Sequence, residues 1–539
     1  MISSAASMSS RSPIRSASLT LGLLLLASCS HDEGAGNGAA PDPAAGAVAP
    51  GTSPGTSPGA PPGAPRGAPA HKRALPHIIL YLVDTLRADR LGLYGNERET
   101  SPAIDALGSK AAVFEHASSQ ACWTLPSVVS LFTGTYPPTH GVLSNFDRLG
   151  PQAETLVEFM HAQGYHTVGF VANTLGGKGA GLDQGYDEFH EDQSVHDLTP
   201  EQVAAGALST QPLYDWAAAY DWNEPVFLYV HTVEPHNPWS GVMHGRPSWF
   251  TGSDADKQHL NDILPEQRGL LSARNNGQMK PGDAERLAAL TAEIEPRVPD
   301  AFSLYDGDVR QANDHLHKLM GMLVGKPGWT STVVVFVADH GEELYEHGNW
   351  FHGQSLYEEL VHVPFVLRIP GLTDEGLRLA QPVQLIDVPP TLAELLGVAP
   401  LAPWQGRSLL PLLRAAHEGR QLPAAPPVYA MRINVDRKFG GDRGDVETVL
   451  REGDWKLIVH HDTARTSLFD LAADPAEQHD LSAAQPARRQ AMLQAVQKRL
   501  HELPKLDLRA AAAGDPAADE EKRQHLEELG YVDGQGRPR

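Results

Sequence analysis

Five short segments of this chain are almost continuously apolar and rich in β-branched residues, and they constrain its fold more than any other feature. Runs of this kind suit strands that are buried on both faces, which is typical of a mostly parallel sheet. Helical stretches lie between the runs. The sequence therefore predicts an α/β fold with a doubly wound, mostly parallel sheet flanked by helices. The runs are 77–84, 167–173, 226–232, 332–339 and 364–371.

The N-terminus has the pattern of an export signal. Arg11 and Arg15 precede an apolar stretch, 19–27, which is too short to cross a bilayer as a helix. Two residues later comes Cys29, in a Leu-Ala-Ser-Cys sequence that resembles the lipobox of bacterial lipoproteins. We expect residues 1–29 to be a lipoprotein signal peptide with lipidation at Cys29. A plain secretory signal with a chance cysteine is the alternative.

The segment after Cys29 is of low complexity and rich in Pro, Gly and Ala, so it predicts a disordered linker. A lipid anchor would hold the exported protein in the cell envelope. The residue after Cys29 is Ser30 and not aspartate. By resemblance to the sorting rules of bacterial lipoproteins, this favours the outer over the inner membrane. The predicted parts are the linker 30–74, a large α/β domain 75–415, a smaller α+β subdomain 416–510 and a tail 511–539.

Composition excludes two classes of protein. The formal net charge of -23 offers no basic footprint for nucleic acid. The only cysteines are Cys29 and Cys122, which excludes a disulfide framework. A long acidic insertion at 186–300 predicts loops that either shape a substrate pocket or decorate the surface.

Three segments carry side chains that can do chemistry. Two of the apolar runs end in Asp84 and Asp339, and His340 follows the second. Ligands bind beyond the carboxyl ends of strands in open α/β sheets, so these groups can converge on one metal ion. A single aspartate there is more often a helix N-cap. Thr124, before Leu-Pro-Ser, can likewise be an N-cap or a metal-activated nucleophile at a helix N-terminus.

A collinear series of motifs extends from about 77 to 505. It opens with VDTLRADRLGLYG at 83–95 and WTLPSVVSLFTGTYPPTHGV at 123–142. By this series the chain is identified as a member of the sulfatase family, in the alkaline phosphatase superfamily. The resemblance implies an α/β hydrolase of sulfate or phosphate esters. The later blocks are 231–239, 305–314, 337–371, 384–397 and 451–481.

The resemblance also implies a metal site. Asp84, Asp339 and His340 match metal ligands of the family, and Thr124 falls where the family keeps its nucleophile, which also contacts the metal. This set implies one divalent ion, Zn, Mn, Mg or Ca. A single imidazole among oxygen ligands favours Zn or Mn over Ca.

Three histidines match further positions of the family's site. His236 falls on a histidine that contacts the ester or the leaving group. His352 falls where relatives place a lysine or histidine that neutralises the transferred oxyanion. His140 falls on a basic position that supports the nucleophile. The resemblance therefore implies that all three take part in catalysis with Thr124.

The chain departs from the family at the nucleophile. Sulfatases that it resembles usually convert the first residue of a Cys-x-Pro-x-Arg signature, cysteine or serine, to formylglycine. Here that position is Thr124, Val128 stands at the arginine, and Cys122 lies two residues early. We therefore predict that Cys122 is unmodified and formylglycine absent.

The leading functional hypothesis is hydrolysis of a sulfate or phosphate ester, on a small molecule or glycan, through a covalent Thr124 intermediate. A phosphodiesterase or a phosphoglycerol- or phosphoethanolamine-type transferase is the alternative. A non-catalytic, glycan-binding surface lipoprotein is a further one. The expected partners are the ester substrate and, through Cys29, a membrane, with no nucleic acid.

Overall fold

The computed structural model describes residues 75–191, 210–239, 249–275, 277–433 and 446–510. The predicted signal peptide with Cys29, the linker and the C-terminal tail lie outside these residues, so they stay predictions. Across the described part of the chain, the structure holds no helix with the length and apolarity needed to span a membrane.

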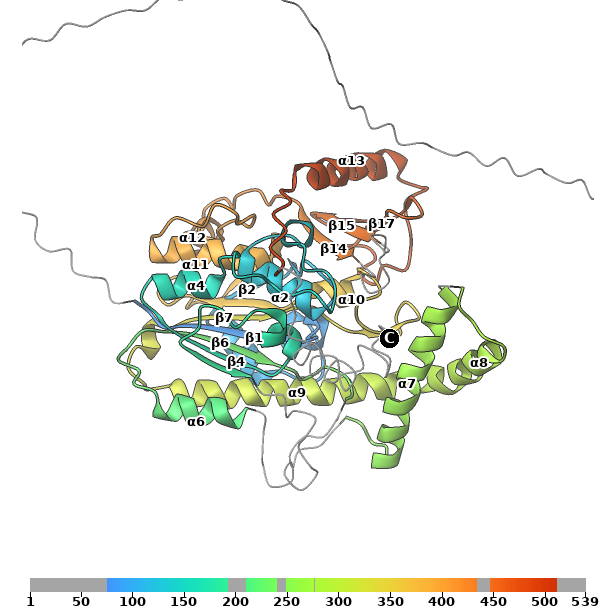
Figure 1. Cartoon of the computed structure of the whole chain (residues 1–539), viewed down its shortest axis with the longest axis horizontal. Helices are drawn as coiled ribbons and strands as arrows, with labels where there is room; N and C mark the ends of the chain where they lie inside the picture. Colours follow the sequence, from blue (N-terminus) through green and yellow to red (C-terminus); the bar gives the residue numbers. More distant parts are fainter. Residues whose placement is uncertain (1–74, 192–209, 240–248, 276, 434–445, 511–539) are drawn as a thin grey trace, which may run out of the picture. The chain divides into compact units, whose positions relative to one another are not determined.

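An eight-stranded mixed sheet forms the centre of the fold (Figure 1). The strand order is β12-β2-β11-β7-β1-β6-β4-β5, and neighbours from β7 to β5 are all parallel. Strand β11 runs antiparallel to β7 and β2. The predicted doubly wound, mostly parallel sheet is confirmed. Its strands are β1 Ile78–Val83, β2 Ala112–Phe114, β4 His166–Val171, β5 Glu188–Glu191, β6 Val226–Thr232, β7 Val333–Ala338, β11 Phe365–Arg368 and β12 Leu377–Leu379.

Helices cover both faces of this sheet (Figure 1). Strands β1 and β7 are buried along their whole length, as their unbroken apolar sequences require. One face is covered by α6 Gln211–Ala219 and α9 Val298–Leu323, the other by α2 Thr124–Thr133, α4 Leu156–Ala162, α11 Val388–Leu396 and α12 Leu410–His417. Shorter elements are α1 Pro102–Gly108, β3 Ala117–Ser118, α3 Pro137–His140, β8 Glu343–Leu344, β9 Trp350–Phe351, α10 Glu358–Val361, β10 His362–Val363 and β13 Val383–Gln384.

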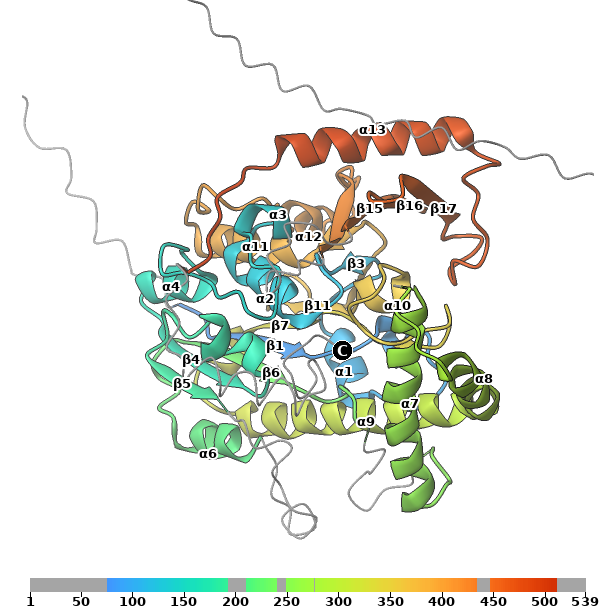
Figure 2. The ribbon, with the colours of Figure 1, turned by 45° about the vertical axis from the view of Figure 1, so that its right-hand side comes forward.

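A small antiparallel sheet follows within the predicted α+β part. Its order is β14-β15-β16-β17, and a tight turn after Glu452 joins β15 to β16. Helix α13 packs across β15 and β16, as Figure 2 shows. The α+β content is confirmed, while the boundary at 416 stays a prediction. The bounds are β14 Val428–Ile433, β15 Val446–Glu452, β16 Trp455–His460, β17 Arg465–Asp470 and α13 Pro486–Glu502.

The insertion at 186–300 differs from the long loops that the sequence predicted. Its described residues include two helices, α7 Asp254–Asn275 and α8 Asp283–Ile294, which pack on each other (Figure 2). Both are polar helices, and α7 contains Pro265. Each helix nevertheless buries apolar side chains at helical spacing, so the period was present in the sequence although loops were predicted. These side chains are Leu260, Ile263, Leu264 and Leu271 in α7 and Leu287, Leu290 and Ile294 in α8.

Candidate active site

Two parallel strands bring the two predicted metal-binding carboxylates together. Strands β1 and β7 are neighbours, and Val83 is in register with Ala338. Asp84 and Asp339 are the next residues of the two strands, so they leave the sheet side by side at its carboxyl edge. Both side chains are completely buried. The two runs that ended in aspartate therefore bring their carboxylates close together.

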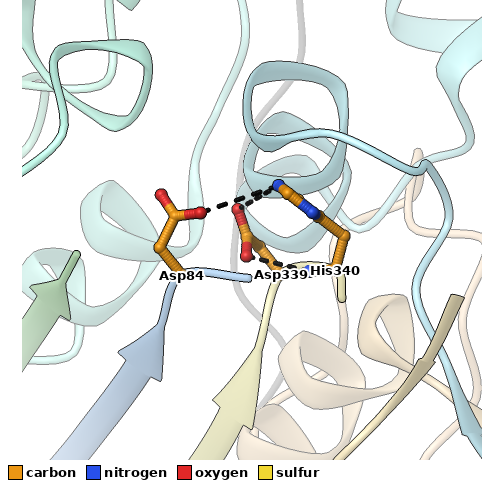
Figure 3. A group of neighbouring side chains, drawn as sticks. All are labelled: Asp84, Asp339 and His340. Atoms are coloured by element: carbon orange, nitrogen blue, oxygen red, sulfur yellow. Dashed lines mark hydrogen bonds and ion pairs between the residues drawn. The ribbon is translucent and has the colours of Figure 1, made fainter. Parts of the chain in front are cut away.

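His340 completes a compact group with these carboxylates (Figure 3). Its Nε2 lies 3.4 Å from Asp339 Oδ2 and 3.7 Å from Asp84 Oδ1. Its Nδ1 is 2.8 Å from the carbonyl oxygen of Gly341, which can only accept, so Nδ1 carries the proton. The lone pair of Nε2 then faces the two carboxylates, which is the form that binds a metal ion.

Each carboxylate offers one oxygen to this centre. Oδ1 of Asp339 accepts hydrogen bonds from the backbone N–H groups of Thr85, at 3.2 Å, and His340, at 2.8 Å. Oδ2 of Asp84 accepts from Asn173 and His231. The remaining oxygens, Asp84 Oδ1 and Asp339 Oδ2, are buried without a hydrogen-bond partner among the described residues. Two such acceptors beside an imidazole lone pair fit a divalent cation.

The electrostatics of the pair also fit a cation. Burial, together with the negative charge of Asp84, raises the pKa of Asp339 well above its ordinary value. Two neighbouring buried carboxylates disfavour each other's ionised form unless a positive charge lies between them. The residues present therefore suit a bound divalent ion better than an empty pair of acids.

Thr124 lies against this group. It is the first residue of α2, and its buried Oγ1 is 3.3 Å from His340 Nε2. The N-cap of α2 is Trp123, so the alternative that Thr124 is itself the helix cap is wrong. Ser127 ties the same turn to the site, since its hydroxyl donates to the carbonyl oxygen of Asp339 at 2.7 Å.

Two of the three predicted catalytic histidines, His236 and His352, lie beside the group of Asp84, Asp339 and His340. The ring of His352 is 4.6 Å from that of His340, and the ring of His236 is 5.0 Å from that of His352. Nδ1 of His352 is 2.8 Å from Glu342 Oε1, and Nδ1 of His236 is 2.5 Å from the carbonyl oxygen of Asn237. Both rings are therefore held in place through Nδ1.

Their surroundings favour neutral imidazoles before a substrate anion arrives. Burial, followed by the nearby His340 and His236, lowers the pKa of His352 well below its ordinary value. Burial also lowers the pKa of His236, although the charge of Asp84 opposes this. A transferred oxyanion beside them would favour the protonated form, so their charge depends on the bound anion.

His140, the third predicted histidine, lies against helix α2. Its Nε2 is 3.1 Å from Ser130 Oγ in α2, and its Nδ1 accepts the backbone N–H of Val142 at 3.1 Å. Burial lowers its pKa to about 3. Ser130 and Val142 thus hold the ring against α2, where burial favours its neutral form, so His140 could support Thr124 only through the helix.

Sequence reasoning missed several residues around the site. Asn173 ends the apolar run 167–173, so it showed the same strand-end signal as Asp84. His231 is the sixth residue of β6 and carried no signal, because it is embedded in an apolar strand. Glu342 also gave none, since its role depends on the distance to His352.

Helix α7 of the insertion supports the segment that carries His352. Trp350 Nε1 donates to Gln267 Oε1 at 2.7 Å, and both side chains are completely buried. Arg268 donates to the carbonyl oxygen of His352 at 2.9 Å. Of the two interpretations of the insertion, a part in shaping the site is therefore favoured over surface decoration.

We expect Gln267→Leu to destabilise this support. The substitution leaves the buried Trp350 Nε1 without its acceptor, at a cost of about 1–3 kcal/mol. Thermal unfolding should show a lower Tm than wild type. Gln258→Leu, on the exposed side of the same helix, is the control and should leave Tm nearly unchanged. Equal Tm values for Gln267→Leu and wild type would contradict the contact.

A second group of acids and histidine, Glu343, His347 and Glu359, lies outside the site. Its members are already bonded to one another and to neighbours: His347 Nδ1 lies 2.5 Å from Glu359 Oε1, and Ser355 donates to Glu343 at 2.8 Å. The ring of His347 stacks on Tyr357 with 3.6 Å between centroids. These contacts give the group a structural role.

The profile of the Sulfatase family matches residues 76–398, which include every residue placed in the site above. The chain belongs to the sulfatase family. As a member, it is a hydrolase of sulfuric or phosphoric esters. In this sulfatase-family chain, residues 345–505 also match the profile "N-sulphoglucosamine sulphohydrolase, C-terminal".

Individual relatives have low sequence identity, but the similarity extends over most of both chains. Arylsulfatase K of Mus musculus is 24% identical over 429 residues, which cover 75% of each protein. BT4656, solved in complex with its substrate D-glucosamine-2-N,6-O-disulfate, matches with a TM-score of 0.60 and 18% identity over 79% of this chain and 97% of its own. Phosphonate monoester hydrolase of Silicibacter pomeroyi matches with a TM-score of 0.60 and 17% identity, over 80% and 97%. At this identity the solved structures establish the fold of this sulfatase-family chain.

Proposed function

We propose that this protein hydrolyses a sulfate or phosphate ester through a covalent ester on Thr124, with one divalent ion held by Asp84, Asp339 and His340. The observation that carries the proposal is the convergence of four buried donor atoms: Asp84 Oδ1, Asp339 Oδ2, His340 Nε2 and Thr124 Oγ1. A bound ion would lower the pKa of the Thr124 hydroxyl and neutralise charge on the transferred group.

The proposed reaction has two displacements. In the first, Thr124 Oγ1 releases its proton to solvent and attacks sulfur or phosphorus, and the bond from that atom to the leaving alcohol breaks. The alcohol takes a proton from an imidazole at the substrate side, either His236 or His352. In the second, water attacks the same sulfur or phosphorus, the bond to Thr124 Oγ1 breaks, Oγ1 takes up a proton from solvent, and sulfate or phosphate departs. The deprotonated imidazole accepts the proton of that water.

The donor set supports a small ion. Each carboxylate presents a single oxygen, and with one imidazole and one hydroxyl the protein supplies four single-atom ligands. Ca²⁺ takes about six to eight oxygen ligands, whereas Zn²⁺ and Mn²⁺ accept imidazole and lower coordination numbers. We therefore propose Zn²⁺ or Mn²⁺, with Mg²⁺ as the alternative.

Formylglycine is the competing nucleophile. Sulfatases that this chain resembles usually carry it, and the family match gives no support to its predicted absence. Two features support Thr124 instead. Threonine cannot form the aldehyde, and Cys122 is a buried free cysteine whose pKa burial raises to about 12, far from a reactive thiolate.

We expect Cys122→Ala to retain activity within about threefold of wild type, since the thiol touches no reacting group in the proposed mechanism. The peptide that contains residues 122–124 should show unmodified masses for Cys122 and Thr124. A loss of activity in Cys122→Ala, with an aldehyde mass on that residue of the wild type, would replace Thr124 by formylglycine.

The substrate class is tested by a panel of an aryl sulfate, a phosphate monoester, a phosphodiester and a phosphonate monoester. Glycan sulfates belong in the panel because BT4656 acts on D-glucosamine-2-N,6-O-disulfate. Turnover of any of these with one equivalent of metal supports the proposal. Absence of both turnover and stoichiometric metal would favour the non-catalytic, glycan-binding alternative.

A specific feature favours phosphodiesters as the second candidate. Threonine replaces the formylglycine precursor, and the threonine members of the superfamily act on phosphodiesters or transfer phosphoglycerol or phosphoethanolamine groups. In a transferase an alcohol would replace water in the second displacement. Product analysis with glycerol as acceptor distinguishes the two. Lipid anchoring at Cys29 and an outer-membrane location remain part of the proposal.

A further inference from the structure

The turn after β4 reaches from the opposite side of the sheet edge to Asp84. Oδ1 of Asn173 accepts the backbone N–H of Leu175 at 2.9 Å, which fixes the orientation of the amide. Nδ2 must then point the other way, and it donates to Asp84 Oδ2 at 2.6 Å. Asn173 is 1% exposed, so no water competes for this bond.

His231 contacts the same oxygen from the neighbouring strand β6. Its Nε2 is 3.3 Å from Asp84 Oδ2, and its Nδ1 is 3.2 Å from the hydroxyl of Tyr229. The turn also makes room for the ring, because a Cβ at Gly176 would lie 2.6 Å from His231 Nδ1. One four-residue turn thus supplies a donor to Asp84 and the space for a second donor.

Asp84 and Asp339 are held by different kinds of group. Backbone N–H groups occupy Oδ1 of Asp339, and no side-chain substitution removes them. For Oδ2 of Asp84 the two described donors are side chains, those of Asn173 and His231. The orientation of Asp84, and with it the free position of Oδ1, therefore depends on two replaceable residues.

We propose that Asn173 and His231 are positioning residues that set the affinity of the metal site by making Asp84 a single-oxygen ligand. The inference rests on the proposed function, since it presupposes the ion at Asp84. Without the two donors, Asp84 can rotate about its side-chain bonds, and the geometry of four single-atom ligands is lost. Residues that orient a metal ligand typically change metal affinity by about 10- to 100-fold.

Metal affinity tests this directly. The full chain is purified without lipidation and stripped of metal with a chelator. It is then titrated with Zn²⁺ against a competing chelator of known affinity. We expect Asn173→Ala and His231→Leu each to weaken Zn²⁺ binding by about 10- to 100-fold. His231→Gln keeps an N–H donor near the position of Nε2 and should retain most of the affinity. Gly176→Ala, which displaces the ring without touching Asp84, should also weaken binding.

The matched control is Asn313→Ala. Asn313 is a buried asparagine in α9 whose Oδ1 accepts two backbone N–H groups, and it lies away from the site. It should lose stability, measured as Tm of the metal-free protein, while its Zn²⁺ affinity stays at the wild-type value. This separates an effect on the ion from a general loss of stability.

The outcomes distinguish the inference from the proposed function. Wild type that binds no stoichiometric Zn²⁺ or Mn²⁺ overturns both. Wild type that binds one ion, with unchanged affinity in Asn173→Ala and in the milder Gly176→Ala, overturns the positioning role alone. Equal weakening in Asn313→Ala does the same, because the effect would then follow stability. If Asn173→Ala or His231→Leu does not fold, His231→Gln is compared with Gly176→Ala instead. Equal Zn²⁺ affinities of these two variants would then overturn the positioning role.

Discussion

Thr124→Ala should lose at least about 10⁴-fold in kcat/KM on the best substrate of the panel, because it removes the atom that attacks. The fold should survive, since Ser127 still ties the helix to the carbonyl oxygen of Asp339. Thr124→Ser keeps a hydroxyl at the same place and should recover a measurable part of the activity. Rates of the three proteins at saturating metal check the expectation.

A trapped covalent intermediate would identify Thr124 as the nucleophile by mass, in addition to the kinetic test. Rapid acid quench of wild type during turnover should give a sulfate or phosphate mass on the peptide that contains Thr124. Thr124→Ala must lack this mass while still binding the ion more weakly through the remaining ligands. Activity in Thr124→Ala close to that of wild type would eliminate Thr124 as nucleophile.

Asp339→Asn should abolish stoichiometric metal binding and reduce activity by about 10³-fold or more. The amide oxygen can keep the two backbone bonds of Oδ1, but the position of Oδ2 then carries N–H donors that repel a cation. Metal content after gel filtration and kcat/KM with added Zn²⁺ or Mn²⁺ measure both effects.

The same substitution should stabilise the metal-free protein. In the metal-free wild type, Asp339 is a buried acid whose pKa burial and the charge of Asp84 raise. A raised folded pKa means that stability falls as pH rises above the ordinary value for aspartate. Asp339→Asn removes this loss, so its metal-free Tm at neutral pH should exceed that of wild type. Saturating metal should reverse the order, because only wild type gains from binding. A lower Tm for Asp339→Asn without metal would contradict the unpaired-carboxylate description.

Much of the site was predictable because its signals are local. Apolar runs predicted buried parallel strands, and a polar residue at the C-terminal end of such a strand lies at the carboxyl edge of the sheet. That argument places Asp84, Asp339 and His340 together from the sequence alone, and the structure brings their ligand atoms close to one another. Motif order then indicated Thr124 and the family.

Other features depend on partners far apart in the sequence. Whether His140 is charged follows from its burial against α2, which a family position does not reveal. The helices of the insertion have an apolar period, but the buried hydrogen bond between Trp350 and Gln267 does not follow from it. The donors on Asp84 come from two other strand ends, 89 and 147 residues away.

The sequence by itself thus determined the sheet, its functional edge and the residue types that gather there, because side-chain periodicity and strand ends are local properties. Only the tertiary structure decided which oxygen of each carboxylate faces the centre, which tautomer His340 adopts and which residues orient Asp84. Those choices are made by hydrogen bonds at distances of about 3 Å between separate segments, and such distances exist only once the chain has folded.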